Sequence, residues 1–371
     1  MTHSDLPFDP HIQTAPTFDR GRPMASFPSD LDPAAIVKLS ANENALGCSP
    51  QVVTAVQAEA AGLALYPPGD GEQKLRSALA AMHGRSLTGD YLVLGNGGLD
   101  ILDFAVRGLL RPGTELITSH PTFGFLDTAA SRLGAVVKNV PLTANFDYDV
   151  AAVRAAVTEQ TRIIYLCNPN NPTGNLVTIE MYEQLLDGLP DNILVISDEA
   201  YAHFAGDDFP DTTRYIHNGR NLLQLYSFSK VFGLAGLRLG YGIARPEIVT
   251  YLARLKRPFH LGRLTIAAGL AAVADQAHIR QTISTITSGR GWLTQQMAEL
   301  GVQVWPSWGN FLLMAVPGFT SEEITPKLLQ HGVMVTSGQR RFALPNHIRV
   351  TVGLPDQNQR FVEVMSKILR S

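Results

Sequence analysis

The chain has 371 residues, of which 45% are hydrophobic and 17% charged, as expected for a soluble globular protein of about two domains. Its formal net charge of −3 lacks the basic surplus typical of proteins that bind nucleic acid or anionic membranes. We find no apolar run long enough to span a bilayer, no secretory signal pattern and no metal-type spacing between Cys48 and Cys167. The sequence therefore predicts a cytoplasmic protein that works without nucleic acid, membrane or metal.

The first 37 residues are rich in proline and aspartate and show little periodicity, which indicates an arm rather than a domain core. Helices are predicted for residues 50–65 and 73–83, and the segment Tyr66-Pro67-Pro68-Gly69 breaks the helical pattern between them. From Tyr91 on, short apolar runs typical of buried strands alternate with helical stretches, one of them at 99–110. The predicted strands are 91–95, 115–118, 135–140, 162–166, 193–197 and 222–225.

This alternation predicts the fold class α/β, with a mostly parallel sheet between helices in a large domain. Ligands of such sheets bind at the carboxyl ends of the strands, and the polar clusters of this chain follow the strands directly. After residue 258 the pattern changes to a long helical stretch at 264–300, strands at 302–305, 311–315, 333–335 and 347–351, and helices at 322–331 and 358–370. We therefore expect an N-terminal arm over 1–43 that packs with the small domain, a large site-bearing domain over 44–259 and a smaller α+β domain over 260–371.

The polar stretch from Ser227 to Gly240 follows the last predicted strand of the large domain and carries Ser229, Lys230, Arg238 and three glycines. Burying an ammonium group is costly, so a lysine held directly after a buried strand loses its proton more easily and becomes a nucleophile toward carbonyls. The glycines let the backbone approach a ligand, and Arg238 with the serine hydroxyls suits a phosphate. The alternative is a glycine-rich surface loop with an exposed lysine and a paired arginine.

Two further loops supply groups for an anion and for a flat ring. The turn at 95–98 opens a helix, and the free amides of Gly97 and Gly98 at the helix N-terminus form an anion site. Phe123 follows the predicted strand at 115–118 and is placed to stack on a flat cofactor ring. Each feature also has an ordinary interpretation, namely a glycine turn before a helix and an aromatic residue in the core.

Two polar motifs follow the next strands of the predicted sheet. Asn171 lies in the loop CNPNNPTG, where its amide suits a phenolic oxygen, although a purely structural turn is the alternative. Asp198 follows a buried strand, where a carboxylate is costly unless it is paired, and a protonated pyridine nitrogen is one such partner. Tyr201 can donate to a ring oxygen from the same side. For Asp198 the alternative is a structural ion pair.

Together these residues supply one group for each part of pyridoxal 5′-phosphate, which we predict as the cofactor. Lys230 would form a Schiff base with it and later move the proton between the substrate carbon and the cofactor. Asp198 would keep the ring nitrogen charged, so that the ring remains an electron sink. The other predicted cofactor residues are Asn171 and Tyr201 at the ring oxygen, Phe123 on the ring face, and Gly97, Gly98, Ser227, Ser229 and Arg238 around the phosphate.

Several motifs extend this pattern over nearly the whole chain: KLSANENALG at 38–47, Tyr66-Pro67, GNGGLDILD at 95–103, PTFGF at 121–125, NPNNPTG at 168–174, DEAY at 198–201, SFSKVFGLAGLRLGYGIA at 227–244, NFLL at 310–313 and IRVTVGLP at 348–355. They resemble the motifs of fold-type I pyridoxal-phosphate aminotransferases of class I and II. Within that class the chain is most similar to the histidinol-phosphate aminotransferase group.

The resemblance implies a large domain with a mostly parallel sheet, a smaller α+β domain, and a homodimer with its active sites at the subunit interface. It implies that Tyr66 reaches the cofactor phosphate of the partner subunit and that Leu99 belongs to the phosphate turn. It also implies that Arg349 binds the anionic end of the substrate, with Asn42 beside it. From the residues alone, Arg349 is only an arginine in a strand of the second domain.

The chain departs from the group's pattern mainly around the substrate. Thr336 stands where the group has a phosphate-binding arginine, and Phe18 is the nearest match to a tyrosine that contacts the same phosphate. PFHLGR at 258–263 replaces an asparagine-rich segment, and the phosphate loop reads Gly-Gly-Leu-Asp at 97–100 instead of Gly-Ser-Asp-Glu. Three arginines are candidates for the missing charge, or else ordinary surface residues: Arg263, Arg340 and Arg341.

We therefore predict a transaminase that transfers an amino group from an amino acid or histidinol phosphate to 2-oxoglutarate or a similar keto acid. Decarboxylases or lyases of the same fold, such as threonine-phosphate decarboxylase relatives, share this machinery and differ in how the substrate is oriented. A regulatory effector-binding domain is a third alternative, but the chain has neither room for a DNA-reading module nor a basic patch. The amino donor stays open among histidinol phosphate, aromatic and acidic amino acids.

Overall fold

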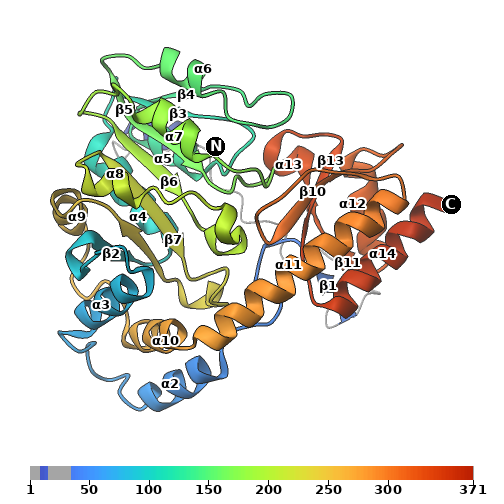
Figure 1. Ribbon diagram of the computed structural model, residues 1–371, viewed down its shortest axis with the longest axis horizontal. Coiled ribbons are helices and arrows are strands. Elements are labelled where there is room, and N and C mark those ends of the chain that lie inside the picture. Colours follow the sequence, from blue (N-terminus) through green and yellow to red (C-terminus); the bar gives the residue numbers. More distant parts are fainter. Residues whose placement is uncertain (1–8, 16–34, 371) are drawn as a thin grey trace.

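The computed structural model describes residues 9–15 and 35–370, and a seven-stranded sheet between helices forms its larger part (Figure 1). The strand order is β2-β8-β7-β6-β5-β3-β4. Strand β8 runs antiparallel to both neighbours, and the other adjacent pairs are parallel, which confirms the predicted α/β class with a mostly parallel sheet. The strands are β2 (Leu92–Gly95), β3 (Glu115–Thr118), β4 (Val136–Asn139), β5 (Thr161–Cys167), β6 (Leu194–Asp198), β7 (Leu222–Ser227) and β8 (Gly240–Ile243).

Each face of this sheet has its own hydrophobic layer, because successive side chains of a strand point to opposite faces. In β5, Tyr165 and Cys167 belong to one layer, and Ile164 and Leu166 belong to the other. Since both faces are covered, the central strands read as unbroken apolar runs in the sequence. The first layer includes α4 (Gly98–Leu109), α5 (Phe125–Arg132) and α9 (Pro246–Ala253), and the second includes α3 (Gly71–His83), α6 (Val150–Ala155), α7 (Ile179–Leu186) and α10 (Arg263–Ala274).

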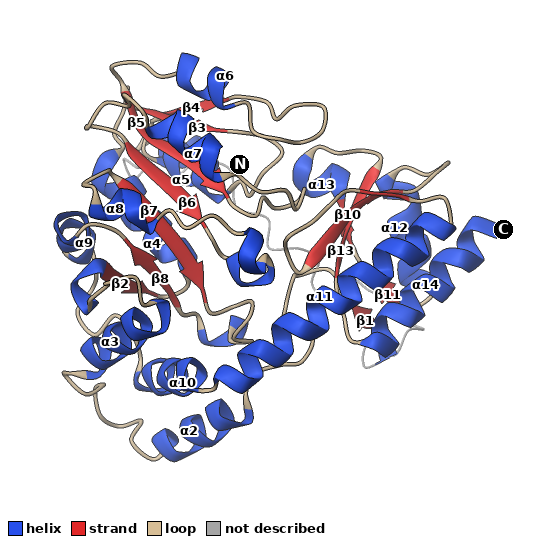
Figure 2. Cartoon of the chain, in the orientation of Figure 1, coloured by secondary structure: helices blue, strands red, loops and turns tan. Residues whose placement is uncertain are grey.

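A second, antiparallel sheet of four strands lies in the C-terminal part, in the order β12-β13-β10-β9 (Figure 2). A separate two-stranded sheet joins β1 near the N-terminus to β11, in parallel. The long helix α11 connects the two large sheets (Figure 1). The elements are β1 (Val37–Lys38), α11 (Gln276–Glu299), β9 (Gln303–Val304), β10 (Phe311–Ala315), α12 (Ser321–Gln330), β11 (Val333–Met334), β12 (Thr336–Ser337), α13 (Gly338–Phe342), β13 (His347–Thr351) and α14 (Pro355–Arg370).

The structure differs from the sequence prediction at the long helical stretch and at β8, and it adds the short elements β12 and α13. The helical stretch expected at 264–300 is interrupted by Asp275, whose side chain caps α11 through the amide of His278 and also accepts a hydrogen bond from Ser49. Strand β8 was not predicted as a strand, because Gly240 and Gly242 weaken its pattern. A side chain at Gly240 would collide with the backbone of Gly98, so glycine permits the close approach of β8 to α4.

The remaining elements are short or peripheral. Helix α10 packs against α2 and α3, and α1 lies on α5. Among residues 9–15 and 35–370, no helix combines the length and the apolar character needed to cross a membrane. The division into an arm over 1–43 and domains over 44–259 and 260–371 stays a prediction. The short or peripheral elements are α1 (Pro10–Thr14), α2 (Pro50–Ala60), α8 (Thr213–His217) and the 3-10 turns η3 (Gly89–Tyr91), η4 (Ala202–Phe204), η5 (Gly206–Asp208) and η6 (Ala235–Leu237).

Candidate active site

The candidate site is a cavity at the carboxyl ends of β5, β6 and β7. Cys167, Asp198 and Ser227 end these three strands, and pairing between neighbours places the ends side by side. The sheet topology therefore assembles groups that lie far apart in the sequence. The predicted residues that line the cavity are Gly98, Leu99, Phe123, Asn171, Asp198, Tyr201, Ser227, Ser229, Lys230 and Arg238.

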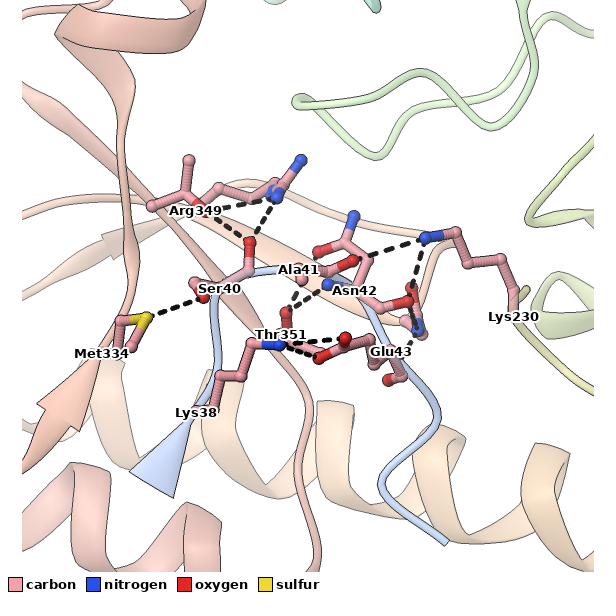
Figure 3. Close-up of polar contacts among 11 residues, drawn as sticks. Lys38, Ser40, Ala41, Asn42, Glu43, Lys230, Met334, Arg349 and Thr351 are labelled. Carbon is pink, nitrogen blue, oxygen red and sulfur yellow. Dashed lines mark hydrogen bonds and ion pairs between the residues drawn. The ribbon is translucent and has the colours of Figure 1, made fainter. Parts of the chain in front are cut away.

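Lys230 follows β7 and extends its side chain into this cavity. Its Nζ donates to the carbonyl oxygens of Asn42 at 3.1 Å and Ala41 at 3.4 Å (Figure 3). Burial, and then the positive charge of Arg349, lower the pKa of Lys230 to about 7. A large fraction of this amine is therefore uncharged near neutral pH, which is the form that attacks a carbonyl carbon.

Asp198 is a buried carboxylate at the floor of the site. Its Oδ2 accepts a hydrogen bond from the Tyr165 hydroxyl at 2.8 Å, and its Oδ1 accepts one from the amide of Ala200 at 3.3 Å. Burial raises the pKa of Asp198 to about 6, although both hydrogen bonds and the charge of Lys230 oppose this rise. A cationic ring nitrogen beside Asp198 would favour its charged form further.

The hydroxyl of Tyr201 lies between two amides. Asn42 Nδ2 donates to it at 3.1 Å and Asn171 Nδ2 at 3.3 Å. Burial raises the pKa of Tyr201 to about 12, so the hydroxyl keeps its proton and remains a donor. Asn42 adopts a left-handed backbone conformation with φ of 52°, which asparagine tolerates better than most residues, and Thr351 binds its side chain and its amide.

The N-terminus of α4 and Arg238 lie against each other as a cradle whose donors suit an anion. Gly97 has φ of 84° and precedes α4, whose first turn has no side-chain cap. A Cβ atom at Gly97 would collide with the guanidinium of Arg238, so glycine is what lets the two groups approach. Arg238 Nη1 also donates to the hydroxyl of Ser229 at 3.3 Å, and the amide of Ser229 donates to Ser227 Oγ at 3.1 Å.

Arg349 lies in β13 and reaches the site from the second sheet (Figure 3). Its Nη1 donates to Asn171 Oδ1 at 2.6 Å, and its Nη2 donates to the carbonyl of Ser40 at 2.7 Å and to Thr336 Oγ1 at 3.2 Å. The Nε atom is buried and has no hydrogen-bond partner among the residues that the structure describes. Burial lowers the pKa of Arg349 to about 10, which still leaves the guanidinium charged at neutral pH. An anion of the substrate would satisfy the unpaired donor.

Comparison with known proteins supports the resemblance to aminotransferases. A family model described as "Aminotransferase class I and II" matches residues 34–365. The chain belongs to this family. It is 37% identical over 351 residues to a histidinol-phosphate aminotransferase of Moorella thermoacetica, covering 94% of this chain and 89% of that relative. A Pseudomonas fluorescens histidinol-phosphate aminotransferase 2 is 36% identical over 97% of this chain and 96% of its own length.

The solved structures lead to the same conclusion. The histidinol-phosphate aminotransferase of Sinorhizobium meliloti, solved in complex with pyridoxal-5′-phosphate, superposes with a TM-score of 0.83 at 25% identity, over 95% of this chain and 98% of that one. A double mutant of the Thermus thermophilus aspartate aminotransferase gives a TM-score of 0.78 at 25% identity, over 90% of this chain and 91% of that one. The predicted enzyme type and the predicted cofactor are confirmed.

The donor set of this aminotransferase fits pyridoxal phosphate on its own geometry. The uncapped start of α4 beside Arg238 suits a phosphate, because helix amides and a guanidinium both favour an anion. Asp198 offers a buried carboxylate to a cationic nitrogen, and Lys230 offers a partly uncharged amine to an aldehyde. These groups all face one cavity.

Tyr66 and Arg263 lie outside the cavity lining, as do Gly97, Asn42 and Arg349 described above. Tyr66 is 72% exposed, and its ring stacks on Phe259 with 4.0 Å between centroids. Arg263 forms an ion pair with Glu59 and donates to the carbonyl of Tyr66 at 3.2 Å, so its charge is already engaged. Phe18 lies outside the described residues.

The other two arginines proposed to replace the missing charge differ in their surroundings. Arg340 pairs with Glu322 at 2.8 Å on the surface, which leaves it engaged away from the cavity. Arg341 lies close enough for its charge to help lower the pKa of Arg349. Thr336, at the position of the expected arginine, donates to the carbonyl of Ser40 at 2.6 Å and so supports the segment that carries Asn42.

Two site residues were missed by the sequence analysis. Glu43 lines the cavity and forms an ion pair with Lys38 at 2.8 Å (Figure 3). Tyr165 holds Asp198 from within β5. The signal for Glu43 was its place in the motif KLSANENALG, and the signal for Tyr165 was a hydroxyl in the otherwise apolar run 163–167.

Proposed function

We propose that this aminotransferase transfers the amino group of histidinol phosphate to 2-oxoglutarate in the cavity at the carboxyl ends of β5, β6 and β7. The observation that carries the transaminase chemistry is the placement of Lys230 and Asp198 in one cavity, beside the cradle of α4 and Arg238. When bound, pyridoxal phosphate supplies an electron sink that stabilises negative charge on the substrate carbon. The relatives at 36–37% identity support the choice of histidinol phosphate as amino donor.

Each protein group has a defined role in this proposal. Asp198 would accept a hydrogen bond from the protonated ring nitrogen and so keep that nitrogen charged, while Asn171 and Tyr201 would bind the ring oxygen. Lys230 would hold the cofactor through its aldehyde in the resting enzyme. Once the amine of the substrate has displaced it, the free amine of Lys230 would move the proton between the substrate carbon and the cofactor. Its lowered pKa, about 7, suits both tasks near neutral pH.

A second donor class, amino acids with a free carboxylate, is favoured by the surroundings of Arg349. Thr336 replaces the expected arginine, and Arg263 and Arg340 are engaged in ion pairs. A single guanidinium matches one carboxylate in a bidentate ion pair. A phosphate monoester carries close to two negative charges, which one guanidinium does not balance. With histidinol phosphate as donor, we propose that Arg341 supplies the second charge.

The test of the proposal compares kcat/KM for histidinol phosphate with kcat/KM for free aromatic and acidic amino acids, with 2-oxoglutarate as acceptor. A clear preference for histidinol phosphate supports the first candidate. A preference for a free amino acid supports the second, and the absence of any amino transfer contradicts both. Decarboxylation, the other chemistry open to this machinery, would release carbon dioxide without forming glutamate.

We further propose a homodimer in which Tyr66 reaches the phosphate of the partner subunit's cofactor. The exposed position of Tyr66 supports this proposal, as does the exposure of its apolar neighbours Leu63 and Leu65, at 63% and 68%. Sedimentation of the active enzyme as a strict monomer would contradict it. The cytoplasmic location stays a prediction from the sequence.

A further inference from the structure

Tyr165 is a fully buried tyrosine with a charged partner. It lies in β5, on the same face of the sheet as Cys167, and its side chain is only 1% exposed. Its hydroxyl donates to Asp198 Oδ2 at 2.8 Å from the neighbouring strand β6. Burial and the nearby negative charge of Asp198 raise the pKa of Tyr165 well above its usual value. The hydroxyl therefore remains a donor over the whole working range of an enzyme.

The direction of this hydrogen bond matters for the chemistry of Asp198. A donor to a carboxylate favours the charged form, whereas burial favours the neutral form. The other groups that act on Asp198 are the amide of Ala200, Lys230 after β7, Cys167 of β5 and Tyr201. Among the described side chains, Tyr165 provides the hydrogen bond to Asp198 that opposes its protonation.

We propose that Tyr165 is a positioning residue for the reaction, because its hydroxyl holds the Asp198 carboxylate in one orientation and keeps it ionised, so that it accepts a hydrogen bond from the protonated ring nitrogen of the cofactor. The inference rests on the proposed role of Asp198. Tyr165 itself touches neither cofactor nor substrate in this proposal. It acts through Asp198 alone.

A purely structural role for the hydroxyl makes different predictions, and the chain offers a matched control. Tyr182 in α7 is also fully buried, but it belongs to the hydrophobic layer on the opposite face of the sheet. Its hydroxyl contacts Ser197 Oγ at 2.5 Å and Asn168 Nδ2 at 3.3 Å, and not Asp198. Tyr182→Phe therefore removes the same atom from a comparable environment and leaves both hydrogen bonds of the Asp198 carboxylate in place.

The experiment compares Tyr165→Phe with Tyr182→Phe and the wild type. Apoenzyme is titrated with pyridoxal phosphate to obtain its dissociation constant, and kcat is measured against pH for the reconstituted enzyme. We expect Tyr165→Phe to weaken cofactor binding about tenfold, as is typical of losing one hydrogen bond to a charged group. Loss of this donor raises the pKa of Asp198, so the acidic limb of the kcat profile moves to higher pH. Tyr182→Phe should leave both quantities as in the wild type.

Equal behaviour of the two variants would overturn the proposal. Asp198→Asn separates this result from a failure of the proposed function. If that variant binds cofactor and turns over as the wild type does, the role of Asp198 is wrong. If it is impaired while Tyr165→Phe matches its control, only the role of Tyr165 is wrong. In the Asp198→Asn background, Tyr165→Phe should have no further effect on cofactor affinity.

A second replacement covers the case in which Tyr165→Phe does not fold. 3-Fluorotyrosine at position 165 keeps nearly the same size and is a stronger hydrogen-bond donor. It should move the acidic limb of kcat to lower pH, opposite to the effect of removing the hydroxyl. An unmoved limb would contradict the proposal.

Discussion

Asn171 Oδ1 accepts a hydrogen bond from Arg349 Nη1 at 2.6 Å, while Nδ2 of the same side chain donates to the hydroxyl of Tyr201 at 3.3 Å. One amide therefore connects the guanidinium proposed to bind the substrate anion with the phenol proposed to bind the ring oxygen. Since Asn171 follows β5 and Arg349 lies in β13, this contact also links the two large sheets. We therefore expect binding of an anion at Arg349 to affect the position of the cofactor ring through Asn171.

Replacing Arg349 by lysine keeps a positive charge but removes the planar pair of donors. We expect Arg349→Lys to raise KM for the amino donor and for 2-oxoglutarate about tenfold to a hundredfold, the range for losing one charged hydrogen bond. Arg340→Lys is the control, because Arg340 pairs with Glu322 at the surface. Steady-state kinetics with unchanged KM values in Arg349→Lys would rule out its role as the substrate anchor.

The phosphate cradle makes a prediction for Gly97. Gly97→Ala places a Cβ atom against the Arg238 guanidinium and forces alanine into a left-handed conformation. We expect a much larger dissociation constant for pyridoxal phosphate, measured by titrating the apoenzyme. The control is Gly291→Ala in α11, where an added Cβ meets nothing within 4 Å and should stabilise the helix by up to about 1 kcal/mol. Tight cofactor binding in Gly97→Ala would place the phosphate elsewhere.

The lowered pKa of Lys230 predicts how cofactor uptake depends on pH. Below a pH of about 7 the amine is mostly protonated and does not attack the aldehyde. The rate of reconstitution, followed in the near-visible spectrum, should therefore rise as the pH passes through about 7 and then level off.

The same measurement on Arg349→Gln tests the electrostatic part of that pKa. Burial is the main cause of the shift, and the charge of Arg349 is the second. Removing the charge raises the pKa of Lys230, so the rise in rate should move to higher pH. A profile that moves to lower pH, or that stays unchanged, would show that Arg349 does not act on Lys230.

Arg341 is expected to distinguish phosphorylated from unphosphorylated donors. The positive charge of Arg341 lies close enough to Arg349 to help lower the pKa of Arg349. Arg340, by contrast, forms an ion pair with Glu322 at the surface. Arg341→Gln should lower kcat/KM for histidinol phosphate about tenfold or more and leave kcat/KM for free amino acids nearly unchanged, with Arg340→Gln as control. If histidinol phosphate is the preferred donor and remains so in Arg341→Gln, another group binds its phosphate.

The cofactor side of the site was predictable from the sequence because its residues follow the ends of successive parallel strands. Asp198 ends β6, Lys230 and Asn171 follow the ends of β7 and β5 by a few residues, and the topology of an α/β sheet then brings the three together. Strand β8 was harder to predict, since its glycines serve a close approach to α4 that only the folded chain reveals.

The substrate side was less predictable. Arg349 reaches the site from a different sheet, and no local pattern indicates which strand of that sheet faces the cavity. Tyr165 was missed because a strand covered on both faces shows no alternation of polar and apolar residues that would mark its orientation. The ion pair of Arg263 with Glu59 likewise depends on the packing of α10 against α2.

The most direct test of the account concerns the amine that holds the cofactor. The holoenzyme is treated with borohydride, which fixes the cofactor covalently to its lysine, and the modified peptide is identified by mass spectrometry. We expect the pyridoxyl group on Lys230, and we expect Lys230→Ala to lose both this modification and amino transfer. A pyridoxyl group on another lysine, or normal amino transfer by Lys230→Ala, would contradict the account.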